Sequence, residues 1–432
     1  MNENRTARNV HDGYDYAPLY DSDSYRILTL MPSSNPKALI RCTLTQRSRR
    51  LDPTYLLPYE ALSYTWGSSR SPKRMILNEQ YVGISKNLHA AMRHLRQEAE
   101  PRTLWVDALC INQADESERS HQVKHMRKIY RHAARVIAWL GEDYDDASCV
   151  MSLIQHHVLK EYTSKWTFIY LLHERLVSTQ AISSFLQRPY WNRIWIIQEL
   201  VVAKDVVLQI GDRAANWECF ELFIQTIDNA FPLLRRDEIS GFLRRVESSG
   251  ETKAALSRNF RHWVFMRHRH NHRKMKNYTY YRMPYRALSK SLVWMFVRLL
   301  ELKRTGRRET LEVLLVATKH TKATDPRDKI FAILGLSKGN DILPDYRLSP
   351  CEVYSQAILA MYNQNIGSSL TKPFETRFQR WRSSYKKHSY GFNCDGHECG
   401  TEDLCFRQIP RCTHDYDMRS TLVVAHNSYD MG

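Results

Sequence analysis

Residues 104–141 of this 432-residue chain, LWVDALCINQADESERSHQVKHMRKIYRHAARVIAWLG, contain the pattern of a complete strand–helix–strand unit. The continuous apolar run at 103–111 predicts a strand that is buried on both faces, as the strands of parallel sheets are. A polar loop at 112–117 leads into a helix whose apolar residues recur at helical spacing. Those residues are Val123, Met126, Ile129, Tyr130 and Ala133. The apolar run at 135–140 predicts the second strand. This order of elements indicates a βαβ unit, and hence a parallel sheet.

The upstream residues extend the alternation of strands and helices. Apolar runs predict strands at 38–44 and 59–66, followed by a hairpin that turns at Asn78-Glu79. Ser85 then caps a helix, because its side chain can accept a hydrogen bond from the first turn. The apolar stripe of this helix consists of Leu88, Ala91, Met92, Leu95 and Ala99.

The downstream residues are predominantly helical in pattern. We expect helix over 145–187, a further helix over 190–203 that opens at Pro189, and a strand at 205–210. The chain therefore divides into regions of different character.

Four regions are expected along the chain. Residues 1–24 are polar and predict a loose arm, and residues 25–215 form the α/β domain. Residues 216–368 are mostly helical, and residues 369–432 form a polar, basic tail without clear periodicity.

The composition excludes several classes of protein. With 43% hydrophobic and 25% charged residues, the chain can bury a core, so disorder over most of its length is excluded. A net charge of +17 favours contact with an anion. Much of that excess falls in the segment 253–298, which carries Lys and Arg but neither Asp nor Glu. We favour a solvated basic segment there over nucleic-acid binding, because no nucleic-acid-binding motif accompanies it.

The cysteines and the N-terminus predict a cytoplasmic protein. Of the nine cysteines, five are scattered among apolar neighbours, namely Cys42, Cys110, Cys149, Cys219 and Cys351. That distribution is typical of buried thiols in a reducing compartment. The N-terminus has no apolar core of a secretory signal, and no apolar run approaches the ~18 residues of a membrane-spanning helix.

Three blocks of sequence carry a resemblance to a known family. They are YEALSYTWG at 59–67, the stretch at 104–141, and RPYWNRIWIIQE at 188–199. In this order they resemble the fungal heterokaryon-incompatibility (HET) domain. DPRDKIFAILGL at 325–336 and LPDYRLSPCEVY at 343–354 are similar to the segment that usually follows it. The resemblance covers roughly residues 20 to 360.

Membership of this family implies a function and partners. It implies a cytosolic effector that triggers programmed cell death when genetically different hyphae fuse. It also implies control by a partner, either a NOD-like receptor or an incompatibility partner protein. Residues 369–432 depart from the family pattern, so the resemblance implies nothing for the tail.

A more remote similarity links the HET domain to TIR domains. It implies a TIR-like (flavodoxin-like) parallel sheet flanked by helices, and a homo-oligomer on activation. Residues 195–200, WIIQEL, are similar to the TIR W-x-x-x-E-L segment, whose Glu is the catalytic carboxylate in NAD-cleaving TIR enzymes. By that resemblance Glu199 would be the catalytic residue, and NAD a substrate, with no cofactor required.

The residue chemistry is compatible with that role. Cleavage of a nicotinamide–ribose bond passes through a state like an oxocarbenium ion, which one carboxylate beside the ribose can stabilise. Trp195 lies one helical turn before Glu199, so its ring could stack on a base. The structural alternative is a surface Glu beside a core Trp.

Further substrate-binding candidates lie where strands end, since ligands of open α/β sheets bind at the carboxyl ends of the strands. The complete set of predicted substrate-binding residues is Trp66, Gly67, Asp107, Asn112, Gln113, Glu118, Arg119, Gln122, Trp195 and Gln198. Arg119 and the backbone of its loop could contact a phosphate. The alternative is that Asp107 and Asn112 fix the loop, and that Glu118 stabilises the start of a helix.

Other functions remain open from the sequence. The same fold could act as a non-catalytic adaptor by self-association, and the segment 253–298 could bind nucleic acid. A Cys110 nucleophile with His121 or His125 as base is disfavoured, because a cysteine within an apolar strand is usually inert. The Cys and His residues of the tail lack the close spacing of a zinc knuckle, so we predict no metal site.

Overall fold

The computed structural model describes residues 14–48, 58–67, 71–144, 147–155, 179–230, 290–339, 341–365, 393–394 and 397–398. The chain forms two compact units, residues 1–347 and residues 348–432. The basic segment up to residue 289 and nearly all of the tail lie outside the described residues.

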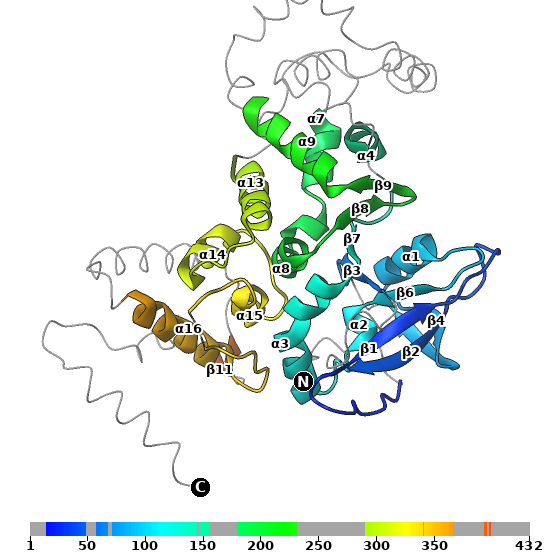
Figure 1. Ribbon diagram of the computed structural model, residues 1–432, viewed down its shortest axis with the longest axis horizontal. Coiled ribbons are helices and arrows are strands. Elements are labelled where there is room, and N and C mark those ends of the chain that lie inside the picture. The colour runs from blue at the N-terminus through cyan, green and yellow to red at the C-terminus, as the bar shows by residue number, and fades with distance from the viewer. Residues whose placement is uncertain are drawn as a thin grey trace, which may run out of the picture. The chain divides into compact units, whose positions relative to one another are not determined.

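One nine-stranded mixed sheet runs through the first unit (Figure 1). Its strands are β1 (Ser24–Leu30), β2 (Arg41–Ser48), β3 (Glu60–Tyr64), β4 (Lys73–Leu77), β5 (Gln80–Ile84), β6 (Arg102–Trp105), β7 (Arg135–Trp139), β8 (Val206–Ile210) and β9 (Arg213–Asn216). Their order across the sheet is β5-β4-β2-β1-β6-β3-β7-β8-β9.

The predicted parallel sheet is confirmed at the centre and corrected at both flanks. Strands β6, β3, β7 and β8 are parallel neighbours. On one side β1 pairs antiparallel with both β2 and β6, and on the other β9 pairs antiparallel with β8. The sequence prediction missed β1 and β9, and it placed β2 three residues too early.

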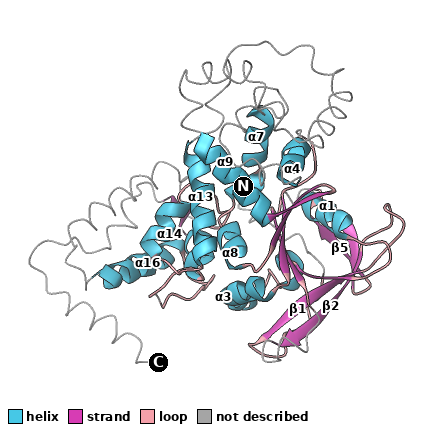
Figure 2. Cartoon of the chain, turned by 45° about the horizontal axis from the view of Figure 1, so that its top comes forward, coloured by secondary structure: helices cyan, strands magenta, loops and turns pink. Residues whose placement is uncertain are grey.

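Helices cover both faces of the parallel strands. In the first unit they are α1 (Lys86–Leu95), α2 (Asp107–Cys110), α3 (Glu116–His132), α4 (Ala147–Gln155), α7 (Thr179–Leu186), the 3-10 helix η2 (Pro189–Asn192), α8 (Trp195–Val202), α9 (Trp217–Ala230), α13 (Lys290–Thr305), α14 (Leu311–Thr318) and α15 (Asp328–Leu334). Figure 2 shows α1 on one side of the sheet, and α3 and α8 on the other.

The second unit contains three described elements. They are α16 (Pro350–Asn365) and the short antiparallel pair β10 (Asn393–Cys394) and β11 (His397–Glu398).

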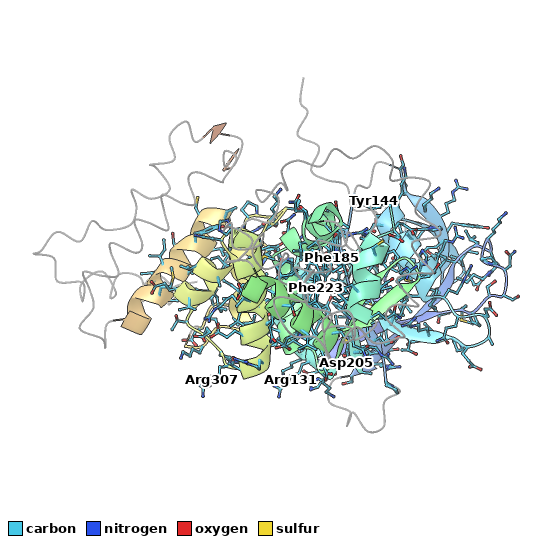
Figure 3. All side chains as sticks on the ribbon, turned by 90° about the horizontal axis from the view of Figure 1, so that it is seen from above. Arg131, Tyr144, Phe185, Asp205, Phe223 and Arg307 are labelled. Carbon is cyan, nitrogen blue, oxygen red and sulfur yellow. The ribbon has the colours of Figure 1, made fainter. Side chains whose placement is uncertain are left out.

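Aromatic residues fill the helical part of the core in the first unit. Phe185 and Phe223 lie at its centre, with ring centroids 6.1 Å apart, whereas Arg131, Asp205 and Arg307 are exposed at one edge (Figure 3). This separation follows from the cost of removing charged groups from water.

The sequence correctly predicted features that depend on residues only a few positions apart. Asn78 and Glu79 have φ angles of 44° and 62°, which makes the predicted two-residue hairpin turn. The Ser85 side chain accepts from the Leu88 backbone N–H at 3.2 Å and caps α1 as expected. All five residues predicted for the inner face of the helix that follows residue 117, which is α3 in the structure, are buried.

Two predicted elements need correction. The apolar run at 103–111 is a strand only to Trp105, because the chain then turns into the single helical turn α2 at Asp107. The predicted helix at 190–203 is broken, because Arg193 is extended (φ −76°, ψ 136°) between η2 and α8. Arg193 instead makes an isolated parallel bridge with Lys322, a contact that the local sequence does not reveal.

The five scattered cysteines form no disulfide with one another, and Cys42, Cys110 and Cys219 are buried. Among the described helices, none has the length and apolar character needed to cross a bilayer.

Candidate functional site

Glu199 lies in a buried polar cluster where β3 ends. The side chain is only 1% exposed and lies in α8, a mainly apolar helix. The Ser63 hydroxyl donates to Glu199 Oε2, and Ser63 Oγ also lies 2.7 Å from the Tyr190 hydroxyl. Strand β3, the 3-10 helix η2 and helix α8 therefore each contribute one of these polar groups.

A second layer of polar groups surrounds the three. The Arg193 guanidinium donates to the Tyr64 carbonyl, and the Tyr130 hydroxyl donates to the Leu62 carbonyl at 3.2 Å. Burial disfavours the charge of Arg193, but the carboxylates of Glu199 and Asp107 outweigh this and raise its pKa. Both carboxylates therefore interact with a single cation, which matches the geometry of a shared site rather than of two separate ion pairs.

The electrostatics of the cluster raise the pKa of Glu199 to about 7. Burial is the largest cause, because the charged form loses its hydration. Arg193 and the hydrogen bond from Ser63 act in the opposite direction but only partly compensate. Glu199 can consequently exchange a proton near neutral pH, as a general acid or base must.

One oxygen of Glu199 is left without a hydrogen bond. Among the described residues, Glu199 Oε1 is buried and has no partner. An unsatisfied buried acceptor costs free energy, so native structures rarely retain one without a role. Tyr130, which also hydrogen-bonds to the Glu199 carboxyl, belongs to the same buried cluster.

Asp107 and Trp66 form the outer side of the same region. Trp66 is 40% exposed, and its indole N–H donates to Asp107 Oδ2 at 2.8 Å. Burial raises the pKa of Asp107, while Arg193 and the Trp66 hydrogen bond lower it. The next residue, Gly67, has φ +75°, a conformation that suits glycine and lets the chain turn sharply away from β3. Trp66, Gly67 and Asp107 thus lie at the predicted carboxyl ends of parallel strands.

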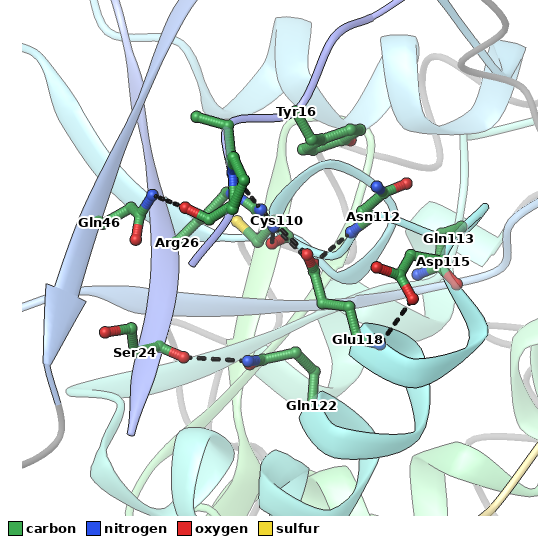
Figure 4. A network of polar contacts seen from close by, with 12 residues as sticks. Tyr16, Ser24, Arg26, Gln46, Cys110, Asn112, Gln113, Asp115, Glu118 and Gln122 are labelled. Carbon is green, nitrogen blue, oxygen red and sulfur yellow. Dashed lines mark hydrogen bonds and ion pairs between the residues drawn. The ribbon is translucent and has the colours of Figure 1, made fainter. Parts of the chain in front are cut away.

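Four other predicted residues form a separate network between β1 and α3 (Figure 4). Glu118 makes a two-pronged ion pair with buried Arg26, at 2.6 and 3.0 Å, and also accepts from the Asn112 backbone N–H at 2.8 Å. Gln122 donates to the Ser24 carbonyl at 3.0 Å. Gln113 donates to the Asp107 carbonyl at 3.1 Å, so it alone of the four touches the Glu199 side of the molecule. Glu118 and Gln122 thus connect α3 to β1, and the Asn112 backbone ties the preceding loop to α3.

The remaining predicted residues face the C-terminal part of the first unit. The Arg119 guanidinium lies 3.9 Å from the centre of the Tyr346 ring. Trp195 hydrogen-bonds with Asp328, whose pKa is nonetheless raised to about 6 by burial. Gln198 packs directly against Gly335. Trp195 and Glu199 therefore point to different neighbours although they share a short helix.

The cluster contains four residues that sequence reasoning missed. They are Ser63, Tyr130, Tyr190 and Arg193. All four lie within the sequence blocks quoted above, where a polar side chain among apolar neighbours was the available signal.

The alternative with a cysteine nucleophile finds no support in the geometry. Cys110 is buried, and burial raises the pKa of its thiol to about 12. His121 contacts the Ser22 carbonyl and the His125 ring instead. Within the described ranges, no three His, Cys, Asp or Glu side chains are grouped so as to hold a metal ion.

Part of the chain, which contains the Glu199 cluster, is similar to known proteins. Residues 59–199 match the family model described as heterokaryon incompatibility protein (HET). The chain is 26% identical over 404 residues to heterokaryon incompatibility protein 6, OR allele, of Neurospora crassa. That alignment covers 82% of this chain and 54% of the relative, so the chain spans about half the length of the curated relative it matches. No solved structure matches the chain. The family segment contains every residue of the Glu199 cluster.

Proposed function

We propose that the protein acts in fungal heterokaryon incompatibility and triggers cell death on recognition of non-self. We further propose that it does so by cleaving the nicotinamide–ribose bond of NAD at the Glu199 cluster. The observation that carries this is the unpartnered Oε1 of a buried carboxylate whose pKa is about 7, within the segment matched by the HET model.

The arrangement of strands supports a TIR-like reading of the domain. In chain order the four central parallel strands are β3, β6, β7 and β8. In the sheet they lie side by side as β6-β3-β7-β8, so the second strand comes first and the spatial order is 2-1-3-4. This order is how doubly wound flavodoxin-like sheets begin, and their ligands bind where the order reverses. Here the order reverses at β3, the strand that supplies Ser63 to the cluster.

The proposed reaction makes limited demands on the site. The bond between ribose C1′ and the nicotinamide nitrogen breaks, and nicotinamide leaves as a neutral molecule with the bonding electrons. The ionised Glu199 carboxylate stabilises the positive charge that develops at C1′. Water then bonds to C1′ and loses a proton to Glu199, which releases it to solvent. The products are nicotinamide, ADP-ribose and one proton.

Two groups, one inside the cluster and one at its outer side, are suited to binding the substrate. Oε1 of Glu199 can accept a hydrogen bond from a ribose hydroxyl. Trp66 is held in place by Asp107 while part of its ring remains exposed, so it can stack on a base without losing side-chain freedom on binding.

A second candidate function is a non-catalytic adaptor that signals by self-association. The observation in its favour is the depth of Glu199, which at 1% exposure resembles a structural buried carboxyl hydrogen-bonded by Ser63. In an adaptor the cluster would only fix the packing of α8 against β3.

Induced expression of the full chain in a filamentous fungus separates the two functions. For an enzyme, Glu199→Gln abolishes growth arrest while the variant still accumulates as folded protein. The matched control, Glu98→Gln, changes an exposed carboxylate far from the cluster and leaves the arrest intact. Growth arrest that survives Glu199→Gln would instead support the adaptor.

We place this activity in the cytosol and propose that the protein self-assembles when a receptor or incompatibility partner activates it. The lack of disulfides among the cysteines of the described region is compatible with a reducing compartment.

A further inference from the structure

The helix that carries Glu199 has weak ends of its own. Helix α8 has only eight residues, and its N-cap, Ile194, provides no side-chain hydrogen bond. At the other end Ala203 leaves the helix in an extended conformation. Short helices are marginal in isolation, and their terminal N–H and C=O groups need partners.

Both ends of α8 are completed by residues 100 or more positions away in the sequence. The Lys303 ammonium, on α13, donates to the Leu200 carbonyl at 2.9 Å and to the Ala203 carbonyl at 2.7 Å. At the opposite end, the Ile194 N–H donates to the Lys322 carbonyl at 3.0 Å. Lys303 thus supplies a positive charge at a helix C-terminus, where the helix dipole favours one.

Helix α15 fixes the first turn of α8. Trp195 hydrogen-bonds with Asp328, the first residue of α15, and the Gln198 side chain packs against Gly335 at the end of α15. Figure 1 shows α8 between the strands and the helices α13 and α15. Glu199, in the same helix, reaches the cluster through its hydrogen bond with Ser63.

We propose that Lys303, together with the segment 322–335, positions Glu199 by holding α8 at both ends. Lys303 is a positioning residue: it never touches the cluster, and it acts only through the last turn of α8. The matched family segment ends at residue 199, so the residues that position its final carboxylate lie outside that segment. Any displacement of α13 relative to α8 would therefore be transmitted to Glu199.

The environment of Lys303 agrees with a structural ammonium. It also lies 5.6 Å from the centre of the Trp217 ring. Burial lowers the pKa of Lys303 to about 8, while the carboxylates of Asp205 and Glu221 favour its charge. The Lys303 side chain is therefore mostly protonated at neutral pH and can donate to the C-terminal carbonyls of α8.

Amide hydrogen exchange on the full chain tests the positioning role without requiring catalysis. We expect Lys303→Met to accelerate exchange of the α8 amides by about tenfold or more, with β3 and α1 unchanged. Lys303→Arg keeps a cation that can reach the same carbonyls and restores most of the protection. Lys204→Met is the matched control, because Lys204 directly follows the end of α8 but is exposed.

A second readout reports on Glu199 itself. The infrared band of the protonated carboxyl, assigned by its loss in Glu199→Gln, gives the titration midpoint of Glu199. In Lys303→Met we expect this midpoint to move from near 7 toward the ordinary value of a Glu, because a loosened α8 admits water. If Lys303→Met does not fold, Asp328→Asn provides the same test at the first turn of α8.

The outcomes separate this proposal from the proposed reaction. Uniformly faster exchange over the whole unit, or an unchanged Glu199 midpoint with α8 still protected, would overturn the positioning role. If α8 loosens as expected but the wild type does not cleave NAD, the positioning role stands and the proposed reaction fails.

Discussion

The ionisation of Glu199 links the candidate site to the stability of the protein. With its pKa raised to about 7 from an ordinary 4.5, the folded state keeps a proton that the unfolded chain has already released between these two values. Glu199 therefore contributes stability that is fully present below about pH 4.5 and is lost as the pH rises through 7.

This gives a prediction for the free energy of unfolding. Between pH 4.5 and 7.5 the wild type should lose about 3 kcal/mol through Glu199, and Glu199→Gln should lack this contribution. Urea unfolding of both proteins across this range measures the difference. Parallel pH profiles for the two proteins would show that Glu199 titrates normally in the folded state.

At the same scale, the sequence predicted part of the candidate site. Glu199, Asp107 and Trp66 were proposed from the motif and from the ends of strands, and the structure brings them into one region. Helical spacing placed Trp195 on the same face as Glu199, but it did not reveal that Trp195 hydrogen-bonds with Asp328, because so distant a partner leaves no trace in local periodicity.

Among the elements, the β4–β5 hairpin offers a test of local strain. Glu79 has φ +62°, which costs an ordinary side chain about 1–2 kcal/mol. Its ion pair with Arg41, at 3.6 Å, is exposed and contributes little. We expect Glu79→Gly to raise the free energy of unfolding by about 0.5–1 kcal/mol, because glycine adopts this conformation freely.

The measurement is thermal or urea unfolding of Glu79→Gly beside Glu79→Ala. The alanine variant removes the same ion pair but keeps the strain, so it should show no gain. Equal stabilisation by both variants would mean that the charge, and not the backbone conformation, is responsible.

The contact between α15 and α8 gives a second test at this scale. A Cβ at Gly335 would overlap the amide oxygen of Gln198 and would come within 3.1 Å of the Arg127 Cβ. Since Gln198 is buried, it cannot simply move away, and we expect Gly335→Ala to cost about 1–3 kcal/mol of stability.

A double variant checks that the cost arises at this contact. Gly335→Ala combined with Gln198→Ala should be less destabilised than the sum of the two single variants, because the shortened side chain makes room. Strict additivity in urea unfolding would place the cause elsewhere.

Sequence patterns predicted elements well where their contacts are local. The hairpin, the Ser85 cap and the buried face of α3 depend on residues a few positions apart. Strand β1 was not predicted from its sequence, SYRILTL, in which Arg26 interrupts the apolar residues. Arg26 is buried against Glu118, 92 residues later in the sequence, and that ion pair makes the strand possible.

At the scale of the whole molecule, the segment that matches the HET model, residues 59–199, depends on contacts with residues outside it. Helix α8 is completed by residues 303–335, which belong to the same compact unit, residues 1–347. We therefore expect a fragment of residues 1–347 to unfold in one cooperative transition. A fragment of residues 1–216 should lack such a transition, because the apolar faces of α8 would be exposed.

Circular dichroism and calorimetry of the two fragments measure this directly. A cooperative transition in the shorter fragment, with a native far-ultraviolet spectrum, would show that the α/β part is self-sufficient.

The most direct test of the proposed function is nicotinamide release from NAD by the purified full chain at high concentration, where self-assembly is favoured. We predict turnover by the wild type and by Glu98→Gln, and a loss of ~100-fold or more in Glu199→Gln, since removal of a single charge-stabilising group has effects of this size. Release by folded Glu199→Gln at the wild-type rate, or no release by assembled wild type, would contradict an NAD-cleaving site at Glu199.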